Sequence, residues 1–106
     1  MKWFLSMAIM NHIENGTITA SAGTGSSNIR AGNNILMQIF IKATTSSTTF
    51  DVSLTDIHDN VMLRRLDETG ELNELMEVPA YGNWTLTIAN ASVDEDFDYL
   101  LAFREV

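Results

Sequence analysis

The sequence of 106 residues contains no cysteine. Disulfide bonds, thiolate zinc sites and a cysteine nucleophile are therefore all excluded. Small extracellular domains often depend on disulfides, so this chain has to be held by core packing or by packing against neighbouring molecules. Its length and its hydrophobic content of 45% are those of one globular domain, which we expect to span residues 1–106.

Basic residues are also scarce, because six Lys and Arg stand against fourteen Asp and Glu and give a net charge of −8. Nucleic-acid binding needs a basic surface that displaces counterions from the phosphates, so no nucleic acid is expected as a partner. An anionic membrane surface is disfavoured for the same reason. The acidity suits a protein that meets a basic or neutral partner surface, or one that collects cations.

A long hydrophobic run is missing as well. The N-terminal stretch MKWFLSMAIM is apolar but too short to span a membrane. A signal peptide is not expected, because a long polar stretch separates this segment from Ala20-Ser21-Ala22, which resembles a cleavage site. We expect residues 1–10 to form the first structural element, an N-terminal strand or arm.

Apolar residues recur at every second position in several segments, which is the pattern of strands with one buried face. The rows run from Met1 to Ile9, Ile35 to Ile41, Phe50 to Leu54, Trp84 to Ile88 and Phe97 to Phe103, and Asp51, Ser53, Thr55, Thr85 and Thr87 fall on opposite faces. No helix-period stretch is long enough to cover a parallel sheet. The pattern predicts an all-β fold of about eight short strands, an antiparallel β-sandwich with a jelly roll as one possible form.

Turn signals separate these rows. Residues 21–34, SAGTGSSNIRAGNN, are polar and glycine-rich and predict a flexible loop. Residues 44–49 and 58–60 predict short connections. Residues 67–71, DETGE, predict a hairpin turn, with a short helix over residues 71–78 as the competing interpretation. Pro79 and Gly82 then interrupt the chain before Trp84.

An acidic cluster near the C-terminus is the strongest candidate for a metal site. Asp94, Asp96 and Asp98 have the spacing of the first ligands of an EF-hand loop, but Tyr99 stands where that loop needs glycine, and the flanks have strand character. A looser calcium site at a hairpin tip remains as an alternative. We favour a solvated turn whose charges discourage edge-to-edge strand pairing. No cofactor is expected.

Catalytic patterns are missing from the sequence. His12 and His58 occur without a G-x-S-x-G elbow, and two histidines without cysteine do not build a typical closed zinc site. The sequence has fourteen acidic residues, so many pairs of carboxylates are conceivable as the catalytic pair of a glycosidase. The composition therefore does not indicate any particular pair. The glycine-rich segment lacks the Lys-Ser/Thr ending of a P-loop. We therefore assign no catalytic residue and expect no enzyme.

The N-terminal segment points to assembly, because it is apolar on both faces and such a strand is hard to leave at a solvated edge. We expect it to be central in a sheet or docked against another subunit. The predicted contact residues, which include two from the 21–34 loop, are Trp3, Phe4, Leu5, Met7, Ile9, Ile29 and Arg30.

The segment VPAYGNWTLTIANAS, with Pro79, Gly82, Trp84, Leu86 and Ile88, resembles a stretch common in pre-peptidase C-terminal-type modules and other bacterial and viral β-sandwich domains. The whole chain also looks like small virion proteins of tailed bacteriophages: short, acidic, cysteine-free and rich in Ser, Thr and Asn. That resemblance implies a capsid decoration or cement protein, usually a symmetric oligomer.

Two functional hypotheses follow. The first is a non-enzymatic virion structural protein made in the host cytoplasm. It would bind the capsid surface as a homo-oligomer, with a trimer favoured, and stabilise the head by bridging subunits of the major capsid protein or another virion protein. The second is a carbohydrate- or cell-surface-binding module, in one version assisted by calcium at Asp94, Asp96 and Asp98.

Overall fold

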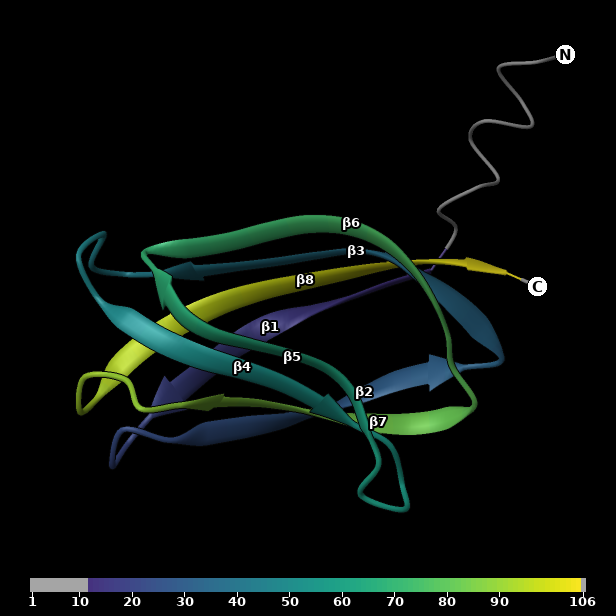
Figure 1. Ribbon diagram of the computed structural model, residues 1–106, viewed down its shortest axis with the longest axis horizontal. Helices are drawn as coiled ribbons and strands as arrows, with labels where there is room; N and C mark the ends of the chain where they lie inside the picture. Colours follow the sequence, from purple (N-terminus) through teal and green to yellow (C-terminus); the bar gives the residue numbers. More distant parts are fainter. Residues whose placement is uncertain (1–11, 106) are drawn as a thin grey trace, which may run out of the picture.

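The computed structural model describes residues 12–105, which form eight strands in two packed antiparallel sheets (Figure 1). The strands are β1 (His12–Ala20), β2 (Gly25–Gly32), β3 (Asn34–Ala43), β4 (Thr49–Thr55), β5 (Val61–Thr69), β6 (Glu71–Pro79), β7 (Gly82–Ala89) and β8 (Glu95–Glu105). One sheet, here sheet A, has the order β1-β8-β3-β6, and the other, sheet B, has the order β2-β7-β4-β5. The expectation of an all-β sandwich of about eight strands is confirmed.

The pairing follows one rule: β1 pairs with β8, β2 with β7, β3 with β6, and β4 with β5, all antiparallel. The chain is thus one long hairpin with its tip at residues 56–60, folded over so that successive pairs fall alternately in the two sheets. This strand order is that of a jelly roll.

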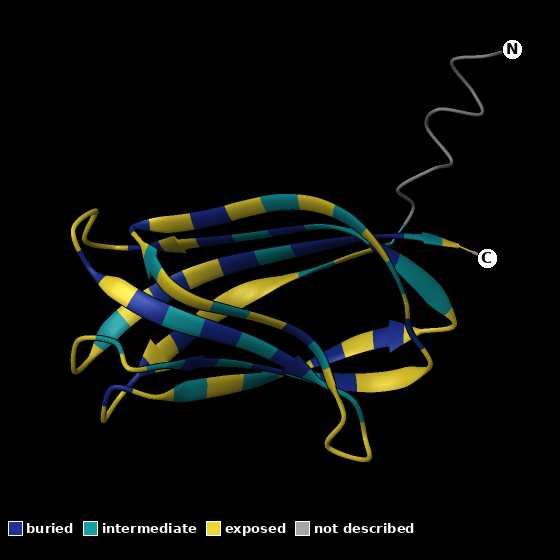
Figure 2. Ribbon diagram, in the orientation of Figure 1, coloured by how far each residue is buried: buried dark blue, intermediate teal, exposed yellow. Residues whose placement is uncertain are grey.

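The core lies between the sheets and is filled by the inward rows that the sequence predicted. Buried and exposed residues alternate along most strands (Figure 2). Three rows are buried throughout: Phe50, Val52 and Leu54; Trp84, Leu86 and Ile88; and Phe97, Tyr99, Leu101 and Phe103. Phe50 meets Phe97 edge to face with ring centroids 4.9 Å apart, a favourable aromatic geometry.

Strand β3 departs from strict alternation. Its pairing with β6 and β8 shifts register between Leu36 and Gln38, where one extra residue is accommodated. Leu36, Ile39 and Ile41 are therefore fully buried, whereas Ile35 and Met37, which the period-two row placed with them, are only half-buried. A bulge of this kind moves every later side chain to the other face, which the spacing of apolar residues alone does not reveal.

Two predicted connections differ from the structure. Residues 25–32 of the expected flexible loop form β2, and residues 21–24 make the turn before it. Residues 67–71 do not close a hairpin, because β5 lies in sheet B and β6 in sheet A, and residues 71–79 are a strand rather than a helix. The described residues contain no helix long and apolar enough to cross a membrane.

The N-terminal segment, residues 1–10, lies outside the described residues, and with it the predicted first strand and the contact residues Trp3, Phe4, Leu5, Met7 and Ile9. The described chain begins at His12, the first residue of β1, at an outer edge of sheet A.

Candidate functional site

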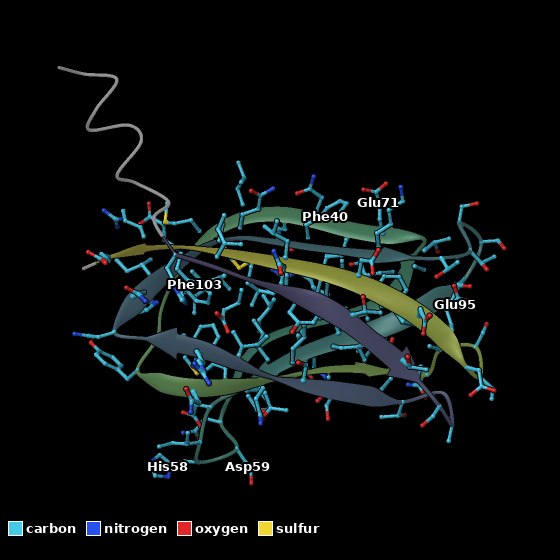
Figure 3. The ribbon with its side chains drawn as sticks, turned by 180° about the vertical axis from the view of Figure 1, so that it is seen from behind. Phe40, His58, Asp59, Glu71, Glu95 and Phe103 are labelled. Atoms are coloured by element: carbon cyan, nitrogen blue, oxygen red, sulfur yellow. The ribbon has the colours of Figure 1, made fainter. Side chains whose placement is uncertain are left out.

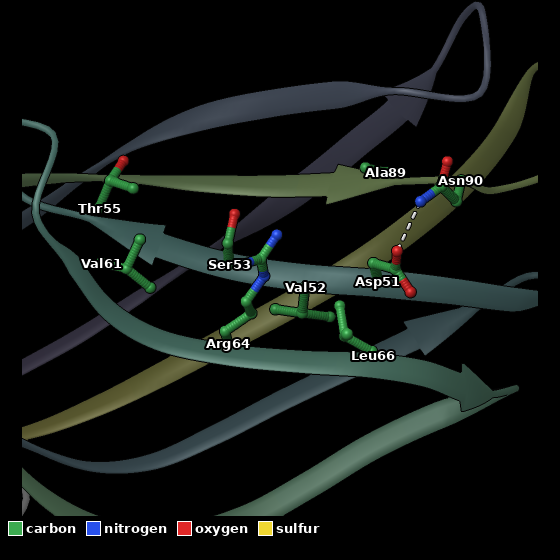
Figure 4. A pocket seen from close by; sticks show the side chains of 9 residues that line it. All are labelled: Asp51, Val52, Ser53, Thr55, Val61, Arg64, Leu66, Ala89 and Asn90. Carbon is green, nitrogen blue, oxygen red and sulfur yellow. Dashed lines mark hydrogen bonds between the residues drawn. The ribbon is translucent and has the colours of Figure 1, made fainter.

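A shallow groove of about 220 Å³ crosses the outer face of sheet B (Figure 4). Its floor is β4, which lies between β5 on one side and β7 on the other. The lining residues are Asp51, Val52, Ser53, Thr55, Val61, Arg64, Leu66, Ala89 and Asn90. The groove is polar along its centre and apolar at Val61 and Leu66, whose side chains are 57% and 56% exposed.

The polar lining follows from strand alternation. Phe50, Val52 and Leu54 point into the core, so Asp51, Ser53 and Thr55 of β4 point outward. Across the ladder, Ser53 lies opposite Thr87 of β7 and Arg64 of β5, and Thr55 lies opposite Thr85. The outer face of sheet B therefore carries adjacent rows of hydroxyl groups beside one guanidinium group.

Asp51 is the anchored carboxylate of the groove. Its Oδ1 accepts a hydrogen bond from the backbone N–H of Asp67 at 2.9 Å, and its Oδ2 accepts one from Asn90 Nδ2 at 2.6 Å. Both donors sit on residues with positive φ, 57° at Asp67 and 53° at Asn90, a conformation that Asp and Asn tolerate better than most residues. A bulge in β5 at Asp67 and the bend after β7 at Asn90 thus hold one side chain.

These contacts also fix the charge of Asp51. The hydrogen bond from the Asp67 backbone, then that from Asn90, and then the nearby positive charge of Arg64 lower the pKa of the Asp51 carboxyl below its ordinary 3.8, and partial desolvation opposes them. The group is ionised at neutral pH and is a weak base. It suits hydrogen bonding to a ligand better than proton transfer.

Arg64 is the free cation of the groove. Its side chain is exposed and, within residues 12–105, takes part in neither of the two ion pairs, which join His12 to Glu14 and Arg65 to Glu74. Its five N–H donors are therefore available to a ligand. Figure 4 shows the Arg64 guanidinium beside Ser53, over the floor of the groove.

The groove offers a specific set of contacts. Hydroxyl groups both donate and accept, Asp51 accepts, Arg64 donates, and Val61 and Leu66 present C–H surface. Of the residues that line it, Asp51 alone is acidic, so the groove holds no carboxylate pair of the kind that hydrolyses glycosides. None of the lining side chains is aromatic, so a sugar ring would meet aliphatic side chains rather than a stacking platform.

The acidic cluster is divided by the structure. Asp94 lies in the turn before β8 with a positive φ of 61°, whereas Asp96 and Asp98 belong to β8 itself. Asp98 accepts a hydrogen bond from Thr17 at 2.8 Å, and Asp96 accepts one from Thr19 at 2.6 Å. Asp94 is thus an exposed turn residue, whereas Asp96 and Asp98, which the sequence pattern placed in the same turn, are strand residues. Within residues 12–105, no three His, Asp or Glu side chains are grouped to hold a metal ion.

The two predicted contact residues in the described chain are placed differently. The side chain of Ile29 is fully buried in the core, so it offers no surface to a partner, and its assignment as a contact residue is corrected. Arg30 is exposed on β2, and its backbone binds β1: its N–H donates to Glu14 Oε1 at 2.9 Å, and its carbonyl oxygen lies 2.8 Å from His12 Nε2. His12 and Glu14 thus fasten the edges of the two sheets together.

Sequence reasoning missed the groove. It did place Asp51, Ser53 and Thr55 on the face opposite the apolar row of their strand. The sequence did contain a signal for the groove, because β4 and β7 carry more hydroxyl side chains than a solvent-exposed face needs. What was missing is the strand order that puts β4 between β5 and β7.

Comparisons with known proteins identify the fold. No family model matches the chain, and no curated protein sequence matches it. The pre-peptidase C-terminal domain of a collagenase from Bacillus anthracis is similar in structure, with a TM-score of 0.55 and 12% identity over 90% of each chain. PliG of Aeromonas hydrophila, a periplasmic inhibitor of g-type lysozyme, matches 92% of this chain and 90% of its own with a TM-score of 0.50 and 12% identity.

A carbohydrate-binding module of the CBM36 type, in complex with calcium and xylotriose, covers 86% of this chain and 89% of its own at 14% identity, with a TM-score of 0.41. At 12% identity the likenesses to the collagenase domain and to PliG show a shared β-sandwich fold alone. The function therefore has to be argued from the groove.

Proposed function

We propose that this protein is a non-catalytic binding module that holds a saccharide in the groove on the outer face of sheet B. The observation that carries the proposal is the convergence of an anchored carboxylate, Asp51, an exposed guanidinium, Arg64, and the hydroxyl groups of Ser53 and Thr55 on one surface. Sugars present hydroxyl groups that need both donors and acceptors, and the groove supplies both.

The size of the groove sets the size of the ligand. Its volume of about 220 Å³ is below the roughly 300–1,000 Å³ of pockets that enclose drug-sized molecules. We expect it to hold one sugar ring or the end of a chain, with the rest of the saccharide in solvent. The exposed side chains of Val61 and Leu66 would pack against the C–H surface of the ring.

Arg64 sets the expected preference among saccharides. A guanidinium group pairs with a carboxylate through two parallel hydrogen bonds, which neutral sugars cannot offer. We therefore expect saccharides that carry a carboxylate to bind more tightly than neutral ones. Because the described residues group no acidic side chains for a metal ion, binding should be the same with calcium and with a chelator.

The test is a glycan array that contains neutral and carboxylate-bearing saccharides, followed by titration calorimetry on the best ligand. Arg64→Ala should weaken binding about tenfold or more, equivalent to about 1.4 kcal/mol, without changing the melting temperature. Arg30→Ala is the matched control, because Arg30 is also exposed but makes its contacts through the backbone. An array without hits, or equal losses in both variants, would refute the proposal.

The hypothesis of a capsid decoration protein stays a prediction, together with its virion partner, its location on the capsid surface and a trimeric state. Its main contact element, residues 1–10, lies outside the described residues. A mixture of the protein with expanded capsids, followed by sedimentation, would test it directly.

A further inference from the structure

The outer face of sheet A carries apolar side chains among polar ones such as Asn15, Gln38 and Asn73. We name as the outer apolar face the apolar side chains that alternate away from the core on all four strands: Ile13, Ile35, Phe40, Leu75, Leu100 and Ala102. Ile13 is 51% exposed and Leu75 is 72% exposed. Phe40 points away from the core, whereas Phe103 points into it (Figure 3).

Strand register makes these residues contiguous. Ala102 of β8 lies between Ile13 of β1 and Gln38 of β3, and Gln38 in turn lies opposite Leu75 of β6. One step along the sheet, Leu100 lies opposite Phe40. Gln38, at the centre of this group, donates a hydrogen bond to Asn73 Oδ1 at 3.0 Å. A sandwich normally turns polar residues outward, and apolar side chains gathered on an outer face mark a site of interaction.

We propose that residues 1–11 of the same chain fold back over the outer apolar face and cover it. These residues join β1 at His12, and the next residue, Ile13, belongs to that face. Eight of the eleven are apolar: Met1, Trp3, Phe4, Leu5, Met7, Ala8, Ile9 and Met10. The proposal concerns sheet A and is independent of the saccharide groove on sheet B.

The length of the segment is sufficient. Eleven extended residues reach about 36 Å at roughly 3.3 Å per residue. A four-stranded sheet has three gaps of about 4.8 Å, so β6 lies only about 14 Å from β1. The segment can therefore cross from Ile13 to Leu75 with residues to spare.

A hydrogen-bond donor on this face favours the same occupant. Arg104 lies opposite Ile35, and its Nε is buried without a hydrogen-bond partner among the described residues. A backbone carbonyl of a returning segment would satisfy this donor, whose lack of a partner is otherwise costly.

The experiment uses the absence of cysteine from the chain. The Leu75→Cys variant, with its cysteine at an exposed position, is labelled with a nitroxide, which quenches the fluorescence of a nearby indole. The fluorescence of Trp3 is the difference between the emission of the labelled variant and that of the same labelled variant carrying Trp3→Phe. We expect at least a twofold loss of Trp3 emission. Ser26→Cys, exposed on β2 of sheet B, is the matched control and should leave Trp3 emission unchanged.

Two outcomes would overturn the proposal. Equal emission of Trp3 with the label at position 75 and at position 26 would mean that the segment does not reach the face. Quenching that disappears when the labelled protein is diluted into an excess of unlabelled Trp3→Phe protein would mean that the segment covers the face of a second copy. Quenching that persists on dilution, in a protein whose native mass is that of a monomer, supports the proposal.

Discussion

At the residue scale, Asp51 shows how a local conformation prepares a binding group. A bulge in β5 and the bend after β7 place Asp67 and Asn90 in the left-handed region, and both residues donate a hydrogen bond to the same carboxylate. An exposed carboxylate would otherwise adopt several rotamers, and ordering it on binding would cost free energy. The groove thus presents its acceptor already oriented.

The same contacts predict a pH dependence of stability. The pKa of Asp51 is lower in the folded protein than in the unfolded chain, so its contribution is present above the unfolded value of 3.8 and is lost as pH falls through the folded value. We expect Asp51→Ala to lower the free energy of unfolding by about 1 kcal/mol at pH 7, and by less at pH values below the folded pKa.

Urea denaturation at pH 7 and at a pH below the folded pKa of Asp51 measures this difference in the free energy of unfolding. Glu77→Ala, on an exposed residue of β6, is the control and should cost little at either pH. If Asp51→Ala lowered the free energy of unfolding equally at both pH values, the ionised carboxylate would not be what stabilises the segments at Asp67 and Asn90.

At the element scale, side chains fasten the two sheets along both of their edges. β1 is joined to β2 through His12, Glu14 and the backbone of Arg30. β5 is joined to β6 by a two-pronged ion pair, in which Arg65 Nε donates to Glu74 Oε2 at 2.8 Å and Arg65 Nη2 donates to Glu74 Oε1 at 2.6 Å. Because β5 and β6 lie in different sheets and form no backbone hydrogen-bond ladder with each other, this ion pair is a polar link between them.

A double-mutant cycle tests the link between β5 and β6. The hydrogen bond from Arg65 is the main cause that lowers the pKa of Glu74, so the pair is charged at pH 7 and weakens as Glu74 is protonated in acid. Both side chains are about one-third exposed, so we expect a coupling energy between Arg65→Met and Glu74→Gln of only about 0.5–1 kcal/mol, reduced by salt. The same cycle with the neighbouring Arg64→Met should give no coupling.

At the scale of the whole molecule, the jelly roll requires the chain to cross repeatedly between sheets, and Gly70 shows how tightly one crossing is packed. Gly70 has a φ of +73°, its N–H donates to the Thr48 carbonyl, and its own carbonyl accepts from the Ala43 N–H, both at 2.8 Å. A Cβ at this position would lie 2.5 Å from the carbonyl oxygen of Ser46.

Gly70→Ala should therefore destabilise the protein strongly. The left-handed conformation costs a non-glycine residue about 1–2 kcal/mol, and the clash with the backbone of Ser46 adds to that cost. Gly82→Ala is the matched control, because Gly82 also has a positive φ, 78°, but its Cβ would meet no atom within 4 Å. Urea denaturation should show a larger loss for Gly70→Ala; equal losses would mean that the crossing can relax.

The sequence by itself determined the fold class and the inward rows of β4, β7 and β8, because alternation along a strand is a local property that the order of residues expresses directly. Only the tertiary structure decided which strands are neighbours, and this choice depends on contacts between residues far apart in the chain. The tertiary structure makes residues 67–71 a crossing between the sheets and not the predicted hairpin. It also places residues 25–32 in a strand and not in a loop, and it buries Ile29. It also brought Asp51 and Arg64 together in one groove, because β4 and β5 pair in a register that no spacing within either strand reveals.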